Sequence, residues 1–160
     1  MEHAIQINQF LVRYSRTLVA DIGDERMAEQ PQAGINHPAW VLGHLGLTAG
    51  RGLALLGVPE TLPKGWTTLF GRGSKPTNSR AGYPSKDELL QAIERGYQQL
   101  REMAVGASPE KLSQPNPNPM LKEALPTVGG LITFLLTGHV GLHLGQLSMW
   151  RRLIGLPPLF

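Results

Sequence analysis

The sequence predicts an all-α protein: a four-helix bundle with long crossover connections, built as a single domain over residues 1–160. Three observations support this fold class. Four runs carry apolar side chains at spacings of three and four, which is the period of an amphipathic helix. Most prolines fall between these runs, where they end helices. No stretch alternates apolar and polar residues as a half-buried strand does.

The first two runs predict helices at residues 3–21 and 36–56. In the first run, one apolar stripe is expected to face the core: Ile7, Phe10, Leu11, Tyr14 and Leu18. In the second run, Asn36 is a favourable N-cap and Pro38 is tolerated in the first turn. This run also contains four glycines, which weaken an isolated helix. They indicate that a neighbouring backbone comes close, or that tertiary packing supports the helix: Gly43, Gly46, Gly50 and Gly52.

The third and fourth runs have clear starting signals. Ser85 followed by Glu88 forms a capping box, and the third run continues to Met103. Thr127 can cap the fourth and longest run, which extends to about Ile154. Two long connections, residues 58–84 and 108–126, separate the second, third and fourth runs. Connections of this length without regular structure are uncommon and are often functional.

Composition excludes several classes of protein. Cys is absent, so disulfides and thiolate ligands are ruled out, and a bound metal must use nitrogen and oxygen donors. The net charge is +3, but the basic residues are scattered, so nucleic-acid binding is not expected. The first residues lack a secretory signal pattern, and no uninterrupted apolar stretch reaches the length of a membrane span. We therefore expect a cytoplasmic protein with no membrane partner.

Three histidines in apolar helical runs point to a metal site. His139 and His143 are four residues apart, so a helix projects both rings from one face. His44 lies in the second run, and a bundle can bring that helix beside the fourth. Three imidazole ligands with one open coordination position are typical of a catalytic metal site. No Asp or Glu lies nearby in these runs, so an all-histidine site is favoured over a di-metal carboxylate site. The alternative is that His139 and His143 are core residues bonded to backbone carbonyls or to Gln146.

Other polar residues are weaker candidates. Gln146 could orient a metal ligand or a bound water, or it could be a buried amide that ties two helices together. Trp40 is expected to pack in the core, with a substrate platform as the alternative. Arg72 belongs to a glycine-containing loop expected over one end of the bundle, where it could meet an anionic substrate. His37 is expected to cap the second helix or lie on the surface, and His3 to be solvated.

Two segments resemble signatures of the DinB/YfiT-like superfamily. Residues 36–45 read NHPAWVLGHL and are similar to the second-helix pattern xPxxWxxxHL of that family. Residues 139–147 read HVGLHLGQL and resemble its last-helix pattern, a histidine pair followed by Gly-Gln. The stretch from Trp66 through Phe70-Gly71 to Tyr83-Pro84-Ser85 is also similar, so the resemblance spans nearly the whole chain.

The resemblance implies both an architecture and a chemistry. It implies an up-up-down-down bundle, often a homodimer, with a divalent metal, nickel or zinc, held by His44, His139 and His143. Members with known activity are mostly transferases and isomerases that use a low-molecular-weight thiol such as bacillithiol, mycothiol or glutathione. We therefore expect a metal-dependent transferase, isomerase or hydrolase acting on a small molecule. The rival expectation is a non-enzymatic bundle with a structural or vestigial metal site that works through a dimer interface.

Overall fold

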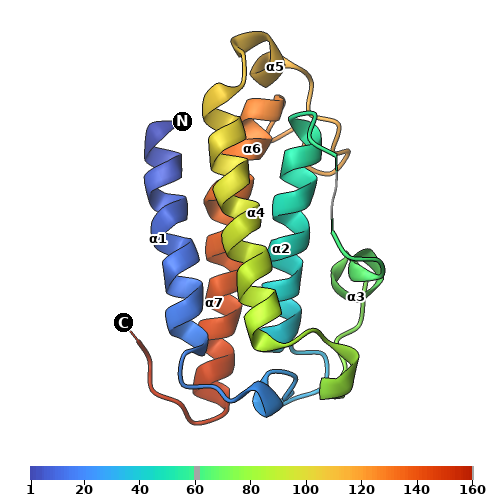
Figure 1. Ribbon diagram of the computed structural model, residues 1–160, viewed down its shortest axis with the longest axis vertical. Helices are drawn as coiled ribbons and strands as arrows, with labels where there is room; N and C mark the ends of the chain where they lie inside the picture. Colours follow the sequence, from blue (N-terminus) through green and yellow to red (C-terminus); the bar gives the residue numbers. More distant parts are fainter. Residues whose placement is uncertain (60–61, 160) are drawn as a thin grey trace.

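The computed structural model describes residues 1–59 and 62–159, and this part of the chain is helical with no strand. Four rods lie side by side (Figure 1). They are α1 (Glu2–Val19), α2 (Pro38–Leu55), α4 (Lys86–Gly106), and a fourth rod made of α6 (Val128–Leu136) and α7 (Gly138–Leu153). Short helices occupy the connections: α3 (Trp66–Phe70), α5 (Pro109–Ser113), and 3-10 turns at Asp24–Arg26 and Arg80–Gly82. The all-α prediction is confirmed.

The direction of the rods differs from the up-up-down-down order that the resemblance implied. In Figure 1, α1 and the α6–α7 rod run one way, and α2 and α4 run the other way. The connections before α2 and after α4 each stay at one end of the molecule. Only the connection from α2 to α4 returns along the length of the rods, which makes these two helices parallel neighbours.

Small residues let α2 and α4 approach closely. A Cβ atom on Gly96 of α4 would lie 3.0 Å from the Cβ of Ala49, and one on Gly46 of α2 would lie 3.3 Å from the Cβ of Ala92. Both contacts are tighter than ordinary van der Waals packing. The expectation that the glycines of the second run mark a close neighbour is confirmed at Gly46.

The predicted apolar stripe of α1 is wrong at two of its five positions. Ile7 is 48% exposed and Phe10 is 47% exposed. The buried side of α1 instead combines polar residues with small and apolar ones: Ala4, Asn8, Val12, Ser15, Leu18 and Val19. The reason is that Asn8 is paired inside the protein. Its amide donates to the Leu136 carbonyl over 2.7 Å and accepts from Arg101 over 2.8 Å.

The fourth run is broken, whereas a single helix was predicted. Thr127 caps α6 as expected, its hydroxyl accepting from the Gly130 N–H over 3.1 Å. At Thr137 the backbone leaves the helical region (φ −125°, ψ −82°), and α7 begins at Gly138. A Cβ atom on Gly138 would lie 3.0 Å from the ring of Phe134, so this position beside the break favours glycine.

Two helix starts give one confirmation and one correction. The capping box of Ser85 with Glu88 is confirmed at α4. At α2 the N-cap is His37, not Asn36 as predicted, because the His37 Nδ1 accepts from the Trp40 N–H over 3.1 Å. His37 is completely buried, so of its two predicted roles the capping role is confirmed. Asn36 is freed for a different contact, described below.

One segment is long and apolar enough to cross a membrane by length and composition alone. It covers Val128–Leu153, and its most apolar window has a mean hydropathy of 1.4 and is 39% buried in the protein. A core helix of a soluble protein passes the same test, so this is weak evidence for a membrane span. The break at Thr137 and the packing of α7 against α1 and α2 agree with a place in the bundle.

Two helical glycines in opposite surroundings give a paired prediction for stability. A Cβ atom on Gly43 would lie 2.3 Å from the fully buried ring of Phe70, whereas one on Gly145 would meet nothing within 4 Å. Gly43→Ala should therefore lower the free energy of unfolding by about 1–3 kcal/mol. Gly145→Ala should raise it by about 0.5–1 kcal/mol through helix propensity. Urea unfolding of the metal-free protein checks both values, and changes of the same sign would contradict the packing described.

Candidate metal centre

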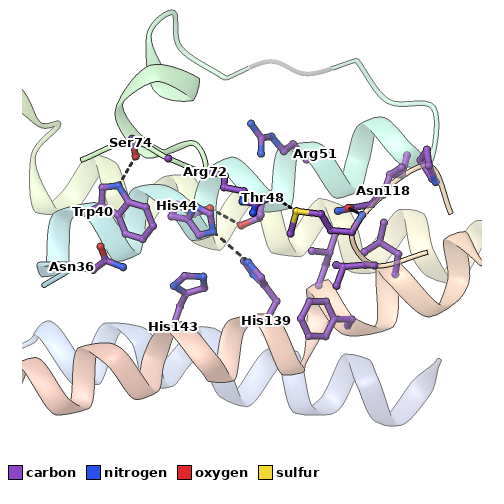
Figure 2. A pocket seen from close by; sticks show the side chains of 18 residues that line it. Asn36, Trp40, His44, Thr48, Arg51, Arg72, Ser74, Asn118, His139 and His143 are labelled. Carbon is purple, nitrogen blue, oxygen red and sulfur yellow. Dashed lines mark hydrogen bonds between the residues drawn. The ribbon is translucent and has the colours of Figure 1, made fainter. Parts of the chain in front are cut away.

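Three elements position the candidate site. Helix α2 supplies Trp40 and His44, helix α7 supplies His139 and His143, and the chain after α3 passes alongside (Figure 2). The rings face a cavity of about 600 Å³. Its lining also includes Asn36, Thr48, Arg51, Arg72, Ser74, Asn118, Met120, Leu131, Phe134 and Leu135.

The prediction that imidazoles from two separate helices converge is confirmed. The Nε2 atoms of His44 and His139 are 3.3 Å apart. The ring of His143 has its centroid 4.5 Å from that of His44 and 4.7 Å from that of His139. One nitrogen from each ring lies within 4.8 Å of the others, so the three could hold a metal ion. Two ligands of a tetrahedral zinc at the usual Zn–N length are about 3.3–3.4 Å apart, which matches the His44–His139 separation.

Hydrogen bonds to the far nitrogens fix two of the rings. The Nδ1 of His44 lies 2.7 Å from the carbonyl oxygen of Phe70. A carbonyl can only accept, so Nδ1 carries the proton and the Nε2 lone pair faces the cluster. The Nδ1 of His143 lies 3.2 Å from Oε1 of Gln146, which also accepts from the Asn36 amide over 3.0 Å. Gln146 therefore contacts His143, as both the ligand-orienting role and the core-histidine alternative expected, and it is exposed rather than buried.

His139 has no such partner. Its Nδ1 is buried without a hydrogen bond to any described residue, and its Nε2 faces the Nε2 of His44. In one tautomer His139 donates its Nε2–H to the His44 Nε2 over 3.3 Å and leaves Nδ1 as an unpaired acceptor. In the other tautomer Nδ1 carries the proton, and the two Nε2 lone pairs face each other in the arrangement that a shared metal ion requires. The donor set and its orientation therefore fit a metal ion.

Burial keeps these rings neutral, which is the form that binds metal. Burial, together with the neighbouring imidazoles of His143 and His44, lowers the pKa of His139 to about 3. Burial, with the nearby His44, lowers the pKa of His143 to about 4. The pKa of His44 is also lowered, again mainly by burial. Neutral rings are thus expected well below the ordinary histidine value of 6.5.

The structure also locates the weaker candidates. Trp40 is a buried core residue, as expected, and it also lines the cavity, where its ring stacks on His44 with centroids 4.8 Å apart. Its Nε1 donates to the Ser74 hydroxyl over 2.8 Å. Arg72 lines the cavity and contacts the sulfur of Met120. The loop that carries Arg72 runs beside α2 rather than over one end of the bundle (Figure 1).

Sequence reasoning missed several residues of the site. The sequence could not indicate the contact of His44 with the Phe70 carbonyl, because any residue can supply a backbone carbonyl. Thr48 and Arg51 follow His44 by four and seven residues, so helical spacing alone could have placed them on the same face of α2. Asn36, expected as a cap, instead reaches Gln146 of α7.

Comparison with known proteins supports one family assignment. A sequence model described as the DinB superfamily matches residues 9–147, a range that includes His44, His139 and His143. Neither the curated proteins nor the solved structures compared with this chain include a match.

The lowered histidine pKa values predict an acid-sensitive metal-free protein. In the unfolded chain each imidazole takes up a proton near pH 6.5, but in the folded protein His139 and His143 do so only near 3 and 4. The unfolded state therefore binds more protons between these limits, and folding stability falls as pH drops from about 6.5 towards 4. Urea unfolding of chelator-treated protein at about pH 7.5 and about pH 5 measures this fall. His139→Gln should reduce it, and equal urea midpoints at the two pH values would contradict the burial described.

Proposed function

The chain belongs to the DinB superfamily, and on that basis we propose that it is a metal-dependent enzyme. It acts as a transferase or isomerase on a small molecule, using a low-molecular-weight thiol as co-substrate. The observation that carries the proposal is the pair of Nε2 atoms 3.3 Å apart on His44 and His139, beside the ring of His143. The metal is divalent, nickel or zinc, as the family resemblance implies.

The three imidazoles are the proposed ligands, and the chain leaves one side of them open to the cavity. A structural zinc is usually closed by four protein ligands. Among the described residues, the cluster of potential ligands contains three members, and no Asp or Glu lines the cavity. A metal with an open position would lower the pKa of a bound thiol or water, so that the nucleophile forms near neutral pH without a carboxylate base.

The residues around the ligands have separate tasks in this proposal. The Phe70 carbonyl and the Gln146 amide hold His44 and His143 in the tautomer that presents Nε2, as outer contacts do in metal sites. Trp40 covers one face of His44 and keeps water from it. The cavity beyond the rings, about 600 Å³ in volume, receives the substrate.

Metal content in single variants tests the ligand set. His44→Ala, His139→Ala and His143→Ala should each lower metal affinity by more than the roughly 10–100-fold that loss of an outer contact costs. His3→Ala, at an exposed position, is the matched control and should keep wild-type metal content. Elemental analysis and chelator competition on protein purified without an affinity tag measure the effect. Full occupancy in all three site variants would overturn the proposed ligands.

A second candidate is the non-enzymatic bundle acting through a homodimer interface. It is favoured by apolar side chains exposed on the adjoining helices α1 and α7, with Ile7 at 48%, Met149 at 53% and Leu142 at 64% exposure. A second copy packed there would remove this surface from water.

Turnover with thiols separates the two candidates. The metal-loaded protein is mixed with an electrophilic small molecule and, in turn, with glutathione, bacillithiol or mycothiol. Conversion of the small molecule is followed together with free thiol, because a transferase consumes the thiol and an isomerase returns it. The enzyme proposal expects turnover with at least one thiol and none in His44→Ala, which removes a ligand. The non-enzymatic candidate expects no turnover with any thiol, together with a dimer mass in light scattering.

A further inference from the structure

The cavity beside the three histidines carries positive charge without a counter-charge. Two arginines line it, Arg51 from α2 and Arg72 from the loop after α3. No Asp or Glu is among its described lining residues. In Figure 2 both arginines lie on one side of the pocket, with His139 and His143 on the other.

Arg51 is available to a ligand. Within residues 1–59 and 62–159, the structure gives its guanidinium no hydrogen bond and no salt bridge, whereas Arg16, Arg26, Arg80 and Arg151 all form salt bridges. Arg72 has a single polar contact, the sulfur of Met120, which is a weak acceptor. A guanidinium presents a planar fork of donors that matches a carboxylate, so Arg51 is poised for one such group.

The position of Arg51 determines its spacing from His44 along α2. It follows His44 by seven residues on α2, which is nearly two full turns, so both side chains project from the same face. Their backbone positions are about 10 Å apart along the helix axis. Thr48 lies between them, but its hydroxyl is engaged with the His44 and Leu45 carbonyls and does not compete for the ligand.

The wall between these two ends is apolar. Leu131, Phe134 and Leu135 of α6 line the cavity, and Leu55, Met120 and Leu121 complete it. Leu131 and Leu135 are buried in the protein and hold this wall in place. A polar ligand without an apolar part would make no apolar contact with this wall. A purely apolar ligand would give the Arg51 guanidinium no hydrogen-bond partner.

From this arrangement we propose that the substrate of the site is a small amphipathic carboxylate. Its carboxylate binds Arg51, its apolar body lies against Leu131, Phe134 and Leu135, and its reacting end reaches the three histidines. This inference rests on the proposed function for the identity of the reacting end. The recognition of the anion, however, is a property of Arg51 and can be measured without a metal.

Calorimetric titration with two probes of the same length tests the proposal. Octanoate carries the carboxylate, and octanamide replaces it with a neutral amide. In metal-free protein, octanoate should bind about tenfold tighter than octanamide, because the guanidinium forms a charge-assisted contact only with the anion. The preference should shrink as salt is added, since the pair lies near solvent.

Variants assign the effect to the residue. Arg51→Gln should remove the preference for octanoate and leave octanamide binding unchanged, and Arg51→Lys should retain part of it. Arg152→Gln, which makes the same charge change on an exposed position of α7 outside the cavity, is the control and should behave as wild type. Equal affinities for the two probes, or an unchanged preference in Arg51→Gln, would overturn the proposal.

Failure of this inference and failure of the proposed function give different results. Zinc titration of the same wild-type protein reports the metal site independently of the probes. If the protein binds zinc through the histidines but shows no preference for octanoate, only the carboxylate proposal is contradicted. If the protein prefers octanoate but binds no divalent metal, the anion site is supported and the proposal of a metal-dependent enzyme is contradicted.

Discussion

The site depends on how one ring, His44, is held between three segments of chain. The Phe70 carbonyl accepts from its Nδ1, the ring of Trp40 stacks on its face, and His139 faces its Nε2. The carbonyl belongs to Phe70, the last residue of α3, and His139 comes from α7, so the ring has a defined direction only when both are in place. Gly43 makes the contact with α3 possible, because a Cβ there would overlap the Phe70 ring. The packing of one aromatic side chain against one glycine thus determines the tautomer of the residue at the centre of the cluster.

The cluster carries an energetic cost that the fold must offset. Three neutral imidazoles are packed together, one buried and two partly buried, and among the described residues the buried Nδ1 of His139 has no hydrogen-bond partner. Leaving such a group unpaired costs about 1–3 kcal/mol. An arrangement of this kind is typical of functional sites, where local stability is given up for chemistry.

The sequence predicts the histidine cluster well because helical spacing and residue type both limit where a histidine side chain can point. It predicts the start of α4 for a similar reason, since the side chains of Ser85 and Glu88 each accept a hydrogen bond from the other's backbone N–H, within four residues. The buried face of α1 was mispredicted because the spacing of apolar residues cannot identify a buried polar residue such as Asn8. The burial of Asn8 depends on a carbonyl 128 residues away in the sequence. The break at Thr137 and the contact of Asn36 with Gln146 depend in the same way on tertiary partners. Arg51 was overlooked because an arginine on a helix is usually a solvated residue, and only the cavity shows what it faces.

The polar contact of Asn8 also restricts how the first helix can be placed. Apart from Leu18 and Val19, the buried side of this helix carries small or weakly apolar side chains, such as Ala4, Val12 and Ser15, which restrict its position along the axis less than large side chains would. A displacement by one turn would leave the Asn8 amide and the Leu136 carbonyl both buried and unpaired, at about 1–3 kcal/mol for each group. The hydrogen bond of Asn8 therefore favours a single register for the helix, in addition to the packing of Leu18 and Val19 at its other end.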